Sequence, residues 1–315
     1  MKRHLIWSVA TILCLLVAVV CFYIFRIRAG EASPDHQQDF SAAEINATHV
    51  AGNIYMLEGA GGGNIGLSIG TDGALLVDDQ FAPLAGKIRE AIGMLGERRL
   101  RYVLNTHWHG DHTWGNEQFG PEATIVAHDN VRKRLSGEWK PVGRKPALPV
   151  RKDALPVITF DRSLSIFFNG EEIRMLHCPN SHTDGDSVVI FTRSNVVHMG
   201  DQFSNGKFPD VDLGGGGDFE GLARNLEAII AQIPADAKII PGHGPLASVS
   251  DLKNYHQLLV ETIAIVRERM EAGESLKQIK DAGLPDKWKS WEKEPGQMRG
   301  WIQAIYQSLS NHTRP

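Results

Sequence analysis

The stretch YVLNTHWHGDHTWGN, residues 102–116, decides how the rest of the sequence is interpreted. Its histidines and aspartate could form a solvated polar loop or one half of a metal site. His107 and His109 lie two residues apart at the end of an extended run, so their side chains point to the same side and can hold one ion together. Gly110 lets the chain turn, after which Asp111 and His112 face a second position. The stretch supplies two ligands to each of two ions, so further ligands must come from elsewhere.

Three further candidate ligands follow at the ends of later strands. His182 lies in PNSHTDGDSVV, Asp201 in VVHMGDQF and His243 in IIPGHGPL, each in loop-forming sequence next to an apolar run. Side chains from different strand ends can converge on one edge of a sheet. Imidazole and carboxylate are the ligands that zinc takes in hydrolytic sites, where one position is left for water. The sequence therefore offers five histidines and two aspartates for two metal ions.

The order of these motifs resembles that of the metallo-β-lactamase fold hydrolases. Residues 107–112 match the HxHxDH signature of that family, and SHTDGD (181–186) is similar to its GHTxG-like turn. GDQF (200–203) is similar to its bridging-aspartate motif, and PGHG (241–244) to the motif of its last histidine. The resemblance covers residues from about 45 to 250, with four ligand motifs in the right order and spacing.

The resemblance implies a fold and a set of metal ligands. The implied fold is α/β, a four-layer αββα sandwich with a helical C-terminal extension. The implied ligands are His107, His109 and His182 on a first zinc, Asp111, His112 and His243 on a second, and Asp201 bridging both. Asp78, in LLVDDQF, matches an aspartate that supports the ligand loop from behind. A strand-end residue making a turn hydrogen bond accounts for Asp78 equally well.

The expected chemistry is metal-assisted hydrolysis of a small molecule. Two dications about 3.5–4 Å apart share a water and lower its pKa toward neutrality. The metal-bridging hydroxide then attacks the carbonyl of an ester, thioester, lactone or β-lactam. Asp111 is expected to orient this nucleophile and carry its proton as well as bind metal. A serine or cysteine nucleophile is not required, and the sequence contains no GxSxG elbow.

Departures from particular branches of the family narrow the prediction. Asp201 stands where one β-lactamase subclass has cysteine, which disfavours that subclass. His112 is similar to another dizinc β-lactamase subclass, but that subclass usually lacks the bridging aspartate, so a β-lactamase proper stays an alternative. Asp201 is typical of glyoxalase II-like thioesterases, lactonases and broad-range hydrolases. Residues 250–315 resemble glyoxalase II only in being helical and carry no glutathione-binding signature.

Two alternatives come from other functional classes. A mononuclear iron dioxygenase acting on persulfides would keep the HxHxDH signature and Asp201 but use only two histidines and one carboxylate on iron. A non-catalytic envelope protein with the same fold would be expected to lack ligands, and the sequence retains every one of them.

Apolar periodicity and turn residues predict the elements that carry these motifs. We expect strands at 53–59, 64–70, 74–79, 101–106 and 123–129, with a helix at 82–95. Asn169-Gly170 predicts a hairpin turn. A helix over 218–232 and a strand over 237–241 follow, with mostly helical sequence from Ser250 onward. The glycine-rich stretches 60–64 and 212–218 are interpreted as mobile loops at the mouth of the site, and His128, His177 and His198 as structural histidines.

The N-terminus predicts a membrane anchor. Residues 5–25 form an uncharged run of 21 residues flanked by basic side chains, and about 20 apolar residues span a bilayer. We therefore expect a transmembrane anchor or signal segment over 1–28, a polar tether over 29–44, a catalytic domain over 45–250 and a helical region over 251–315 packed on it. The catalytic domain is expected outside the cytoplasm, held at the cell membrane or exported if the segment is cleaved.

Composition excludes some partners. The 315-residue chain is 42% hydrophobic and 22% charged, as expected of a globular protein. Beyond residue 28 it carries 29 basic against 37 acidic side chains, a balance that speaks against nucleic-acid binding. Cys178 is the only cysteine after the apolar run, so that part of the chain cannot form an internal disulfide.

Overall fold

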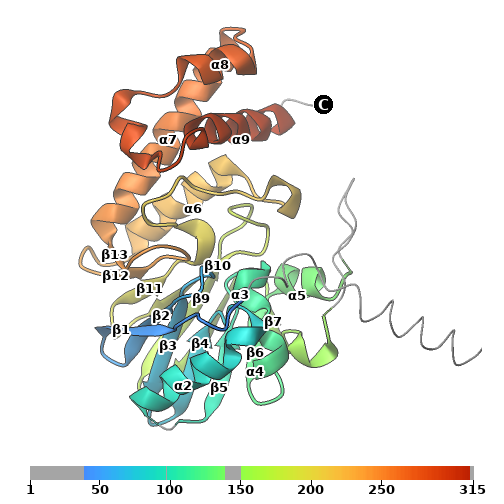
Figure 1. Cartoon of the computed structure of the whole chain (residues 1–315), viewed down its shortest axis with the longest axis vertical. Coiled ribbons are helices and arrows are strands. Elements are labelled where there is room, and N and C mark those ends of the chain that lie inside the picture. Colours follow the sequence, from blue (N-terminus) through green and yellow to red (C-terminus); the bar gives the residue numbers. More distant parts are fainter. Residues whose placement is uncertain (1–38, 97, 139–149, 313–315) are drawn as a thin grey trace, which may run out of the picture. The chain divides into compact units, whose positions relative to one another are not determined.

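Two mixed β-sheets carry the metal-ligand motifs at the ends of their strands (Figure 1). The structure is a computed structural model that describes residues 39–96, 98–138 and 150–312. The first sheet has the order β1 (Asn46–Ala51), β2 (Ile54–Glu58), β3 (Ile65–Gly70), β4 (Gly73–Val77), β5 (Leu100–Leu104), β6 (Thr124–His128), β7 (Ile158–Phe160). The second has the order β13 (Ala247–Ser248), β12 (Lys238–Ile240), β11 (Val196–His198), β10 (Ser187–Phe191), β9 (Glu171–His177), β8 (Ser163–Phe168).

The direction of the strands brings several loops to one edge. Strands β4, β5, β6 and β7 are parallel to one another, and β11 is parallel to β12, whereas the remaining pairs are antiparallel. Parallel neighbours have their carboxyl ends on the same side, which is where ligand sites form in α/β sheets. Asp78 follows β4 and His107 follows β5 at this edge in the first sheet. Asp201 and His243 follow β11 and β12 in the second.

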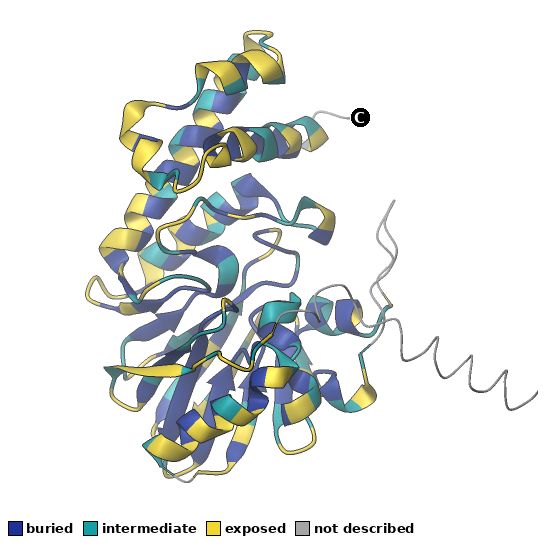
Figure 2. Cartoon of the chain, in the orientation of Figure 1, coloured by how far each residue is buried: buried dark blue, intermediate teal, exposed yellow. Residues whose placement is uncertain are grey.

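Apolar side chains fill the space between the sheets and the space above the second one. The inner cluster joins residues such as Leu75 and Val126 of the first sheet to Met175 and Val189 of the second. An outer cluster packs the other face of the second sheet against α6 (Phe219–Gln232), α7 (Val249–Glu271) and α9 (Gln297–His312). Figure 2 shows central strands such as β3 and β4 dark blue because they are buried on both faces, whereas the edge strand β1 is mostly exposed. These two clusters hold the sheets at the distance that the site requires.

Shorter helices complete the layers. The first sheet carries α2 (Ala85–Leu95), α3 (Gly110–Thr113), α4 (Asn116–Phe119) and α5 (Asp129–Leu135), and α8 (Leu276–Ala282) lies between α7 and α9 in the chain. Short 3₁₀ helices occur at η2 (Ala82–Leu84), η3 (Lys152–Ala154), η4 (Gly200–Gln202), η5 (Leu213–Gly215) and η6 (Asp286–Trp291). The α/β sandwich with C-terminal helices that the resemblance implied is confirmed.

Most predicted elements occur near their predicted positions. Asn169 and Gly170 both have positive φ, 52° and 80°, as the predicted two-residue hairpin turn between β8 and β9 requires. Strand β1 was not predicted, because its residues are mostly exposed and show little alternation.

Residues 43–315 form one compact unit. The predicted anchor over 1–28 and most of the predicted tether lie outside the described residues. Within the described ranges, no helix combines the length and apolar character needed to span a bilayer.

Candidate metal centre

All seven predicted ligands converge at the edge where the parallel strands end. They come from the loop after β5 (His107, His109), from α3 (Asp111, His112), from the turn before β10 (His182), from η4 after β11 (Asp201) and from the turn after β12 (His243). Part of this convergence follows from topology, because the ends of β4 and β5 lie side by side in one sheet and those of β11 and β12 in the other. His182 arrives by a different route, on the turn that leads from β9 back into β10.

The seven residues form two groups of possible metal ligands. His107, His109, His182 and Asp201 make up the first group, and Asp111, His112 and His243 the second. Within each group, the ligand atoms lie within 4.8 Å of one another. This spacing allows each group to surround one ion.

Asp201 lies between the two groups. Its Oδ1 is 3.2 Å from Nε2 of His112, and its Oδ2 is 3.4 Å from Nε2 of His243, both in the second group. The same Oδ2 is 3.6 Å from Nε2 of His182 in the first group. A carboxylate in this position can contribute an oxygen to each of two ions.

The polar atoms at the centre fit divalent cations. Nε2 of His107, Nε2 of His112 and Oδ1 of Asp201 are buried and make no hydrogen bond to any described residue. A buried polar atom without a partner costs about 1–3 kcal/mol, so such atoms are rare in folded proteins. Binding of cations would give all three atoms a partner. A set of imidazole and carboxylate donors suits zinc and related transition metals.

Charge at the centre also favours cations. Burial opposes ionisation of Asp201, but neighbouring histidines, His112 above all, outweigh it and hold the pKa of this carboxyl well below its usual range. Burial likewise opposes a charge on His243, but its contacts with Asp111 and Asp201 raise the pKa of the ring to about 9. Protons on these rings therefore balance the carboxylates, as metal ions would.

Asp78 supports His112 from behind, as the resemblance implied. Its Oδ2 accepts hydrogen bonds from Nδ1 of His112 and Oγ1 of Thr106, both at 2.8 Å, and its Oδ1 accepts one from the Thr106 backbone N–H at 2.7 Å. Asp78 has a φ of +64°, which turns the chain sharply at the end of β4. The hydrogen bond at Nδ1 directs Nε2 of His112 toward the centre, where it could bind a metal ion once its proton is displaced.

The glycine-rich stretch 60–64 lies at the mouth of the site, where Ala60, Gly61 and Gly62 line a hollow beside His243, and its end packs against the candidate ligands. A Cβ on Gly63 would lie 2.2 Å from Cε1 of His112, so only glycine fits there. Gly63 donates its N–H to the carbonyl of Asp111 at 3.2 Å and accepts a hydrogen bond from Nε2 of Gln80 at 2.6 Å. Asn64 holds the turn that carries His243, through hydrogen bonds from its side-chain amide to the carbonyls of Pro241 and Gly244. This segment therefore presses on the ring of His112.

Asp212, in the second glycine-rich stretch, is a residue at the site that the sequence did not reveal. Its Oδ2 lies 3.2 Å from Nε2 of His109, on the side of the ring away from Nδ1, which faces His182. Its Oδ1 accepts the Gly215 N–H at 2.8 Å. Burial opposes its charge, but the hydrogen bond with His109 holds the pKa of Asp212 at about 2. Asp212 thus orients His109 as Asp78 orients His112.

The segment around Asp212 is also packed rather than mobile. Arg134 of α5 forms two hydrogen bonds to Asp184, at 2.7 and 2.6 Å, and a third to the carbonyl of Gly215 at 2.6 Å. Its side chain is almost fully buried. One guanidinium therefore joins the turn that carries His182 to the turn that carries Asp212.

The remaining strand histidines make structural contacts, in agreement with their interpretation. Each hydrogen-bonds a backbone carbonyl: His128 that of Asp161, His177 that of Asp186 and His198 that of Asn64. The rings of His128 and His177 stack at 3.6 Å and 11°. Burial and this neighbouring ring lower the pKa of His128 to about 4.

Comparison with known proteins assigns the fold and the motifs to one family. The sequence model of the Metallo-beta-lactamase superfamily matches residues 58–244, which include all seven candidate ligands. A hydroxyacylglutathione hydrolase of Methylococcus capsulatus is 29% identical over 219 residues, 64% of this chain and 69% of that protein. A hydroxyacylglutathione hydrolase of Nitrosococcus oceani is 26% identical over 149 residues, 46% of this chain and 49% of that protein.

Solved structures agree on the fold. A metallo-beta-lactamase from Pontibacter korlensis has a TM-score of 0.54 and 17% identity, covering 69% of this chain and 99% of that one. A sec-alkylsulfatase from Pseudomonas sp. has a TM-score of 0.62 and 14% identity, covering 84% of this chain. The match spans only half of the alkylsulfatase chain. At these identities the likeness concerns the fold alone.

Proposed function

This chain belongs to the metallo-beta-lactamase superfamily, and from that premise we propose that it is a dinuclear zinc hydrolase that cleaves a thioester or related ester of a small molecule. The observation that carries the proposal is the position of Asp201 between two complete groups of ligands. The hydroxyacylglutathione hydrolases that resemble the chain support a thioester as the bond that is cleaved. Hydrolysis itself is the activity of the family.

The proposed ligand assignment follows the two groups. His107, His109 and His182 bind the first ion, Asp111, His112 and His243 bind the second, and Asp201 binds both. Bound zinc ions would lower the pKa of a water molecule and polarise the carbonyl that it attacks. Asp78 and Asp212 fix the rings of His112 and His109, so that the metal-binding nitrogens point inward.

Asp111 is the carboxylate placed to handle protons. Its side chain is 30% exposed, against 11% for Asp201, so it reaches the space where a substrate must lie. Its Oδ2 is 3.3 Å from Nε2 of His243, which holds it at the edge of the second group. In this position Asp111 can take a proton from the attacking water and return it to the leaving thiol or alcohol.

Metal analysis and a substrate panel test the proposal. The full chain, purified with detergent present throughout, is expected to contain about two zinc ions per chain and to hydrolyse an acyl thioester faster than nitrocefin, a homoserine lactone or a phosphodiester. A His109→Ala variant should stay folded, lose metal from the first group and lose activity. His49→Ala, which changes an exposed histidine of β1, is the matched control and should behave as wild type.

The outcomes separate the alternatives. About one iron and no zinc per chain would favour the persulfide dioxygenase and reject the hydrolase. Preference for nitrocefin would identify a β-lactamase proper. Full turnover in the His109→Ala variant would reject the dinuclear mechanism.

A further inference from the structure

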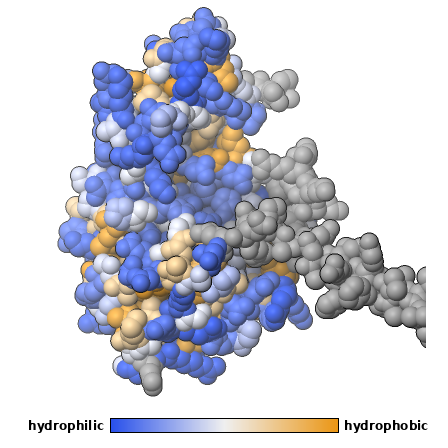
Figure 3. Space-filling model, viewed as in Figure 1, coloured by the Kyte–Doolittle hydropathy of each residue, from blue (hydrophilic) through white to orange (hydrophobic). Residues whose placement is uncertain are grey.

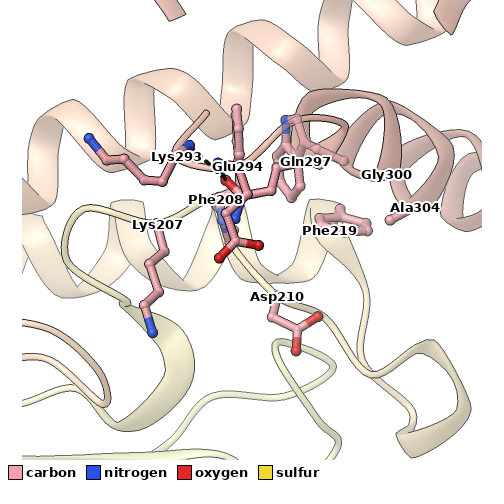
Figure 4. Close-up of a pocket in the computed structure, with 11 residues that line it drawn as sticks. Lys207, Phe208, Asp210, Phe219, Lys293, Glu294, Gln297, Gly300 and Ala304 are labelled. Atoms are coloured by element: carbon pink, nitrogen blue, oxygen red, sulfur yellow. Dashed lines mark hydrogen bonds between the residues drawn. The ribbon is translucent and has the colours of Figure 1, made fainter. Parts of the chain in front are cut away.

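A cavity of about 440 Å³ lies between the chain segment that follows Asp201 and the C-terminal helix α9. Figure 4 shows residues 207–210 and Phe219 on one side, and the segment leading into α9 on the other. On the face shown in Figure 3, apolar surface appears below α9, between it and α6. The volume falls within the range of about 300–1,000 Å³ that small-molecule sites occupy.

The cavity adjoins the metal centre through residues 207–210. Asp210 lines the cavity, and its backbone carbonyl accepts a hydrogen bond from Nδ1 of His182 at 2.9 Å. Lys207 lines the cavity and also a second hollow, of about 480 Å³, whose wall includes His243 and Asn64. The cavity and the hollow beside His243 therefore border the same side chain, Lys207, so a substrate that reacts beside His243 lies next to the cavity.

Aromatic rings form one wall of the cavity, and the charged residues Lys207, Asp210, Lys293 and Glu294 complete its lining. Phe208 and Trp301 lie with ring centroids 5.7 Å apart and nearly parallel, and Phe219 meets the Trp301 ring edge-on at 4.9 Å. A hydrogen bond from Nε1 of Trp301 to Oγ1 of Thr262 fixes the tryptophan. Such aromatic walls favour aromatic or branched aliphatic ligands through buried area and ring contacts.

Small residues on α9 keep the cavity open. Gly300 and Ala304 both line it and stand one helical turn apart, so no long side chain from these positions enters the space. A larger side chain at position 304 would fill the cavity without altering any candidate metal ligand.

We infer that this cavity binds an apolar aryl or branched-alkyl group of the substrate. The inference rests on the proposed function for the reaction, and it extends that function by naming the substrate class. The preferred substrates are thioesters or esters that carry such a group on the acyl or the thiol side. Helix α9 is then part of the substrate site.

Ligand binding tests the cavity independently of catalysis. We use 4-phenylbutan-1-ol as a neutral probe and 1-butanol as the matched compound without a ring, both titrated calorimetrically into the full chain stripped of metal. The phenyl compound should bind measurably more tightly than butanol. Ala304→Trp should weaken its binding by about tenfold or more, and Ala304→Leu by less. Gln307→Trp, which adds the same bulk at an exposed position of α9, should leave binding unchanged.

Kinetics on the zinc-loaded chain test whether the cavity serves the reaction. Thioesters with and without a phenyl group, on the acyl side and on the thiol side, should differ by about tenfold or more in kcat/KM on at least one side. Ala304→Trp should abolish this preference, whereas Gln307→Trp, outside the cavity, should keep both the preference and the kcat/KM for the small acetyl thioester. Thermal melts check that each variant is folded, and a variant that unfolds is replaced by Phe208→Ala, which removes one wall.

The two proposals fail in different ways. Hydrolysis without any preference for the phenyl group, unaffected by Ala304→Trp, would overturn the cavity inference and leave the hydrolase intact. Absence of hydrolysis with intact phenyl-dependent binding would overturn the hydrolase and leave the cavity as a binding site. Equal binding of both alcohols, or binding that Ala304→Trp does not change, would overturn the inference outright.

Discussion

The substitution Asp78→Asn tests how the hydrogen bonds that Oδ2 of Asp78 accepts from His112 and Thr106 contribute to metal binding. Asparagine has the same shape as aspartate and tolerates the positive φ of this position. With its amide oxygen at the place of Oδ1, it can still accept the Thr106 N–H. Its NH₂ group then replaces Oδ2, which in the wild type accepts the proton of His112 Nδ1. The variant therefore changes the protonation of one ring with little change in packing.

The expected loss follows from the tautomer of His112. An NH₂ group donates to Nδ1, so the ring proton moves to Nε2, which faces Asp201 at 3.2 Å. A protonated Nε2 cannot bind metal. Replacing the partner of a ligating histidine weakens metal binding about 10–100-fold, or about 1.4–2.8 kcal/mol at about 1.4 kcal/mol per tenfold. This matches the value of about 1.5–3 kcal/mol for a hydrogen bond to a charged group.

Competition with a chelator of known zinc affinity measures the effect. Two binding steps should be resolved, and Asp78→Asn should weaken one of them while the other changes little. Asp72→Asn is the matched control, because Asp72 also accepts a backbone N–H, that of Asn169, but takes no part in the metal centre. Unchanged affinity for both ions in a folded Asp78→Asn protein would refute the role of Asp78.

Three further predictions concern other contacts of the structure. Gly63→Ala should lower zinc content below two per chain and destabilise the fold by about 1–3 kcal/mol, because the new Cβ meets the ring of His112. Gly86→Ala, in open space on α2, is the control. A normal metal content in Gly63→Ala would contradict the close packing. Asp212→Asn should weaken zinc binding about tenfold in chelator competition by releasing His109, and wild-type affinity would disprove that role. The free energy of unfolding in urea should fall as the pH falls from about 6.5 to about 4. Over this range His128 binds a proton in the unfolded chain, whereas native His128, with its pKa of about 4, stays neutral. His128→Gln should reduce this dependence of the unfolding free energy on pH. An unchanged dependence would assign it to other groups.

The places of the candidate metal ligands could be predicted because they depend on local sequence. Each of His107, Asp201 and His243 follows the end of a strand by a few residues. Parallel pairing brings the ends of β11 and β12 together in one sheet, and the packing of the two sheets brings the end of β5 to them. The sheets themselves follow from short apolar runs between turn residues. The fold and the seven candidate ligands therefore needed no knowledge of how distant loops pack.

Contacts between loops could not be predicted in this way. Asp212 meets His109 across 103 residues of sequence, and the cavity joins residues 207–210 to residues 293–304. Nothing in the local composition of DLGGGGD distinguishes a packed turn from a mobile loop. The glycines there reflect close approach, since a Cβ on Gly217 would lie 2.2 Å from the carbonyl oxygen of His182. Glycine-rich sequence was thus interpreted as flexible where it is in fact closely packed.

The segment from Lys207 to Asp212 contacts both the candidate ligand histidines and the cavity. It therefore links metal binding to substrate specificity, two properties that evolution would otherwise tune separately. The Asp210 carbonyl and the Asp212 carboxylate steady two ligand histidines, while Lys207 and Asp210 face the cavity under α9. A substitution here that admits a new substrate also disturbs the rings behind it. In the proposed dinuclear zinc hydrolase, diversification through this segment would therefore change the zinc concentration at which the centre is fully loaded. Residues 300 and 304 of α9 are not subject to this constraint. Substitutions that change substrate specificity without changing metal binding are therefore expected on the C-terminal helix.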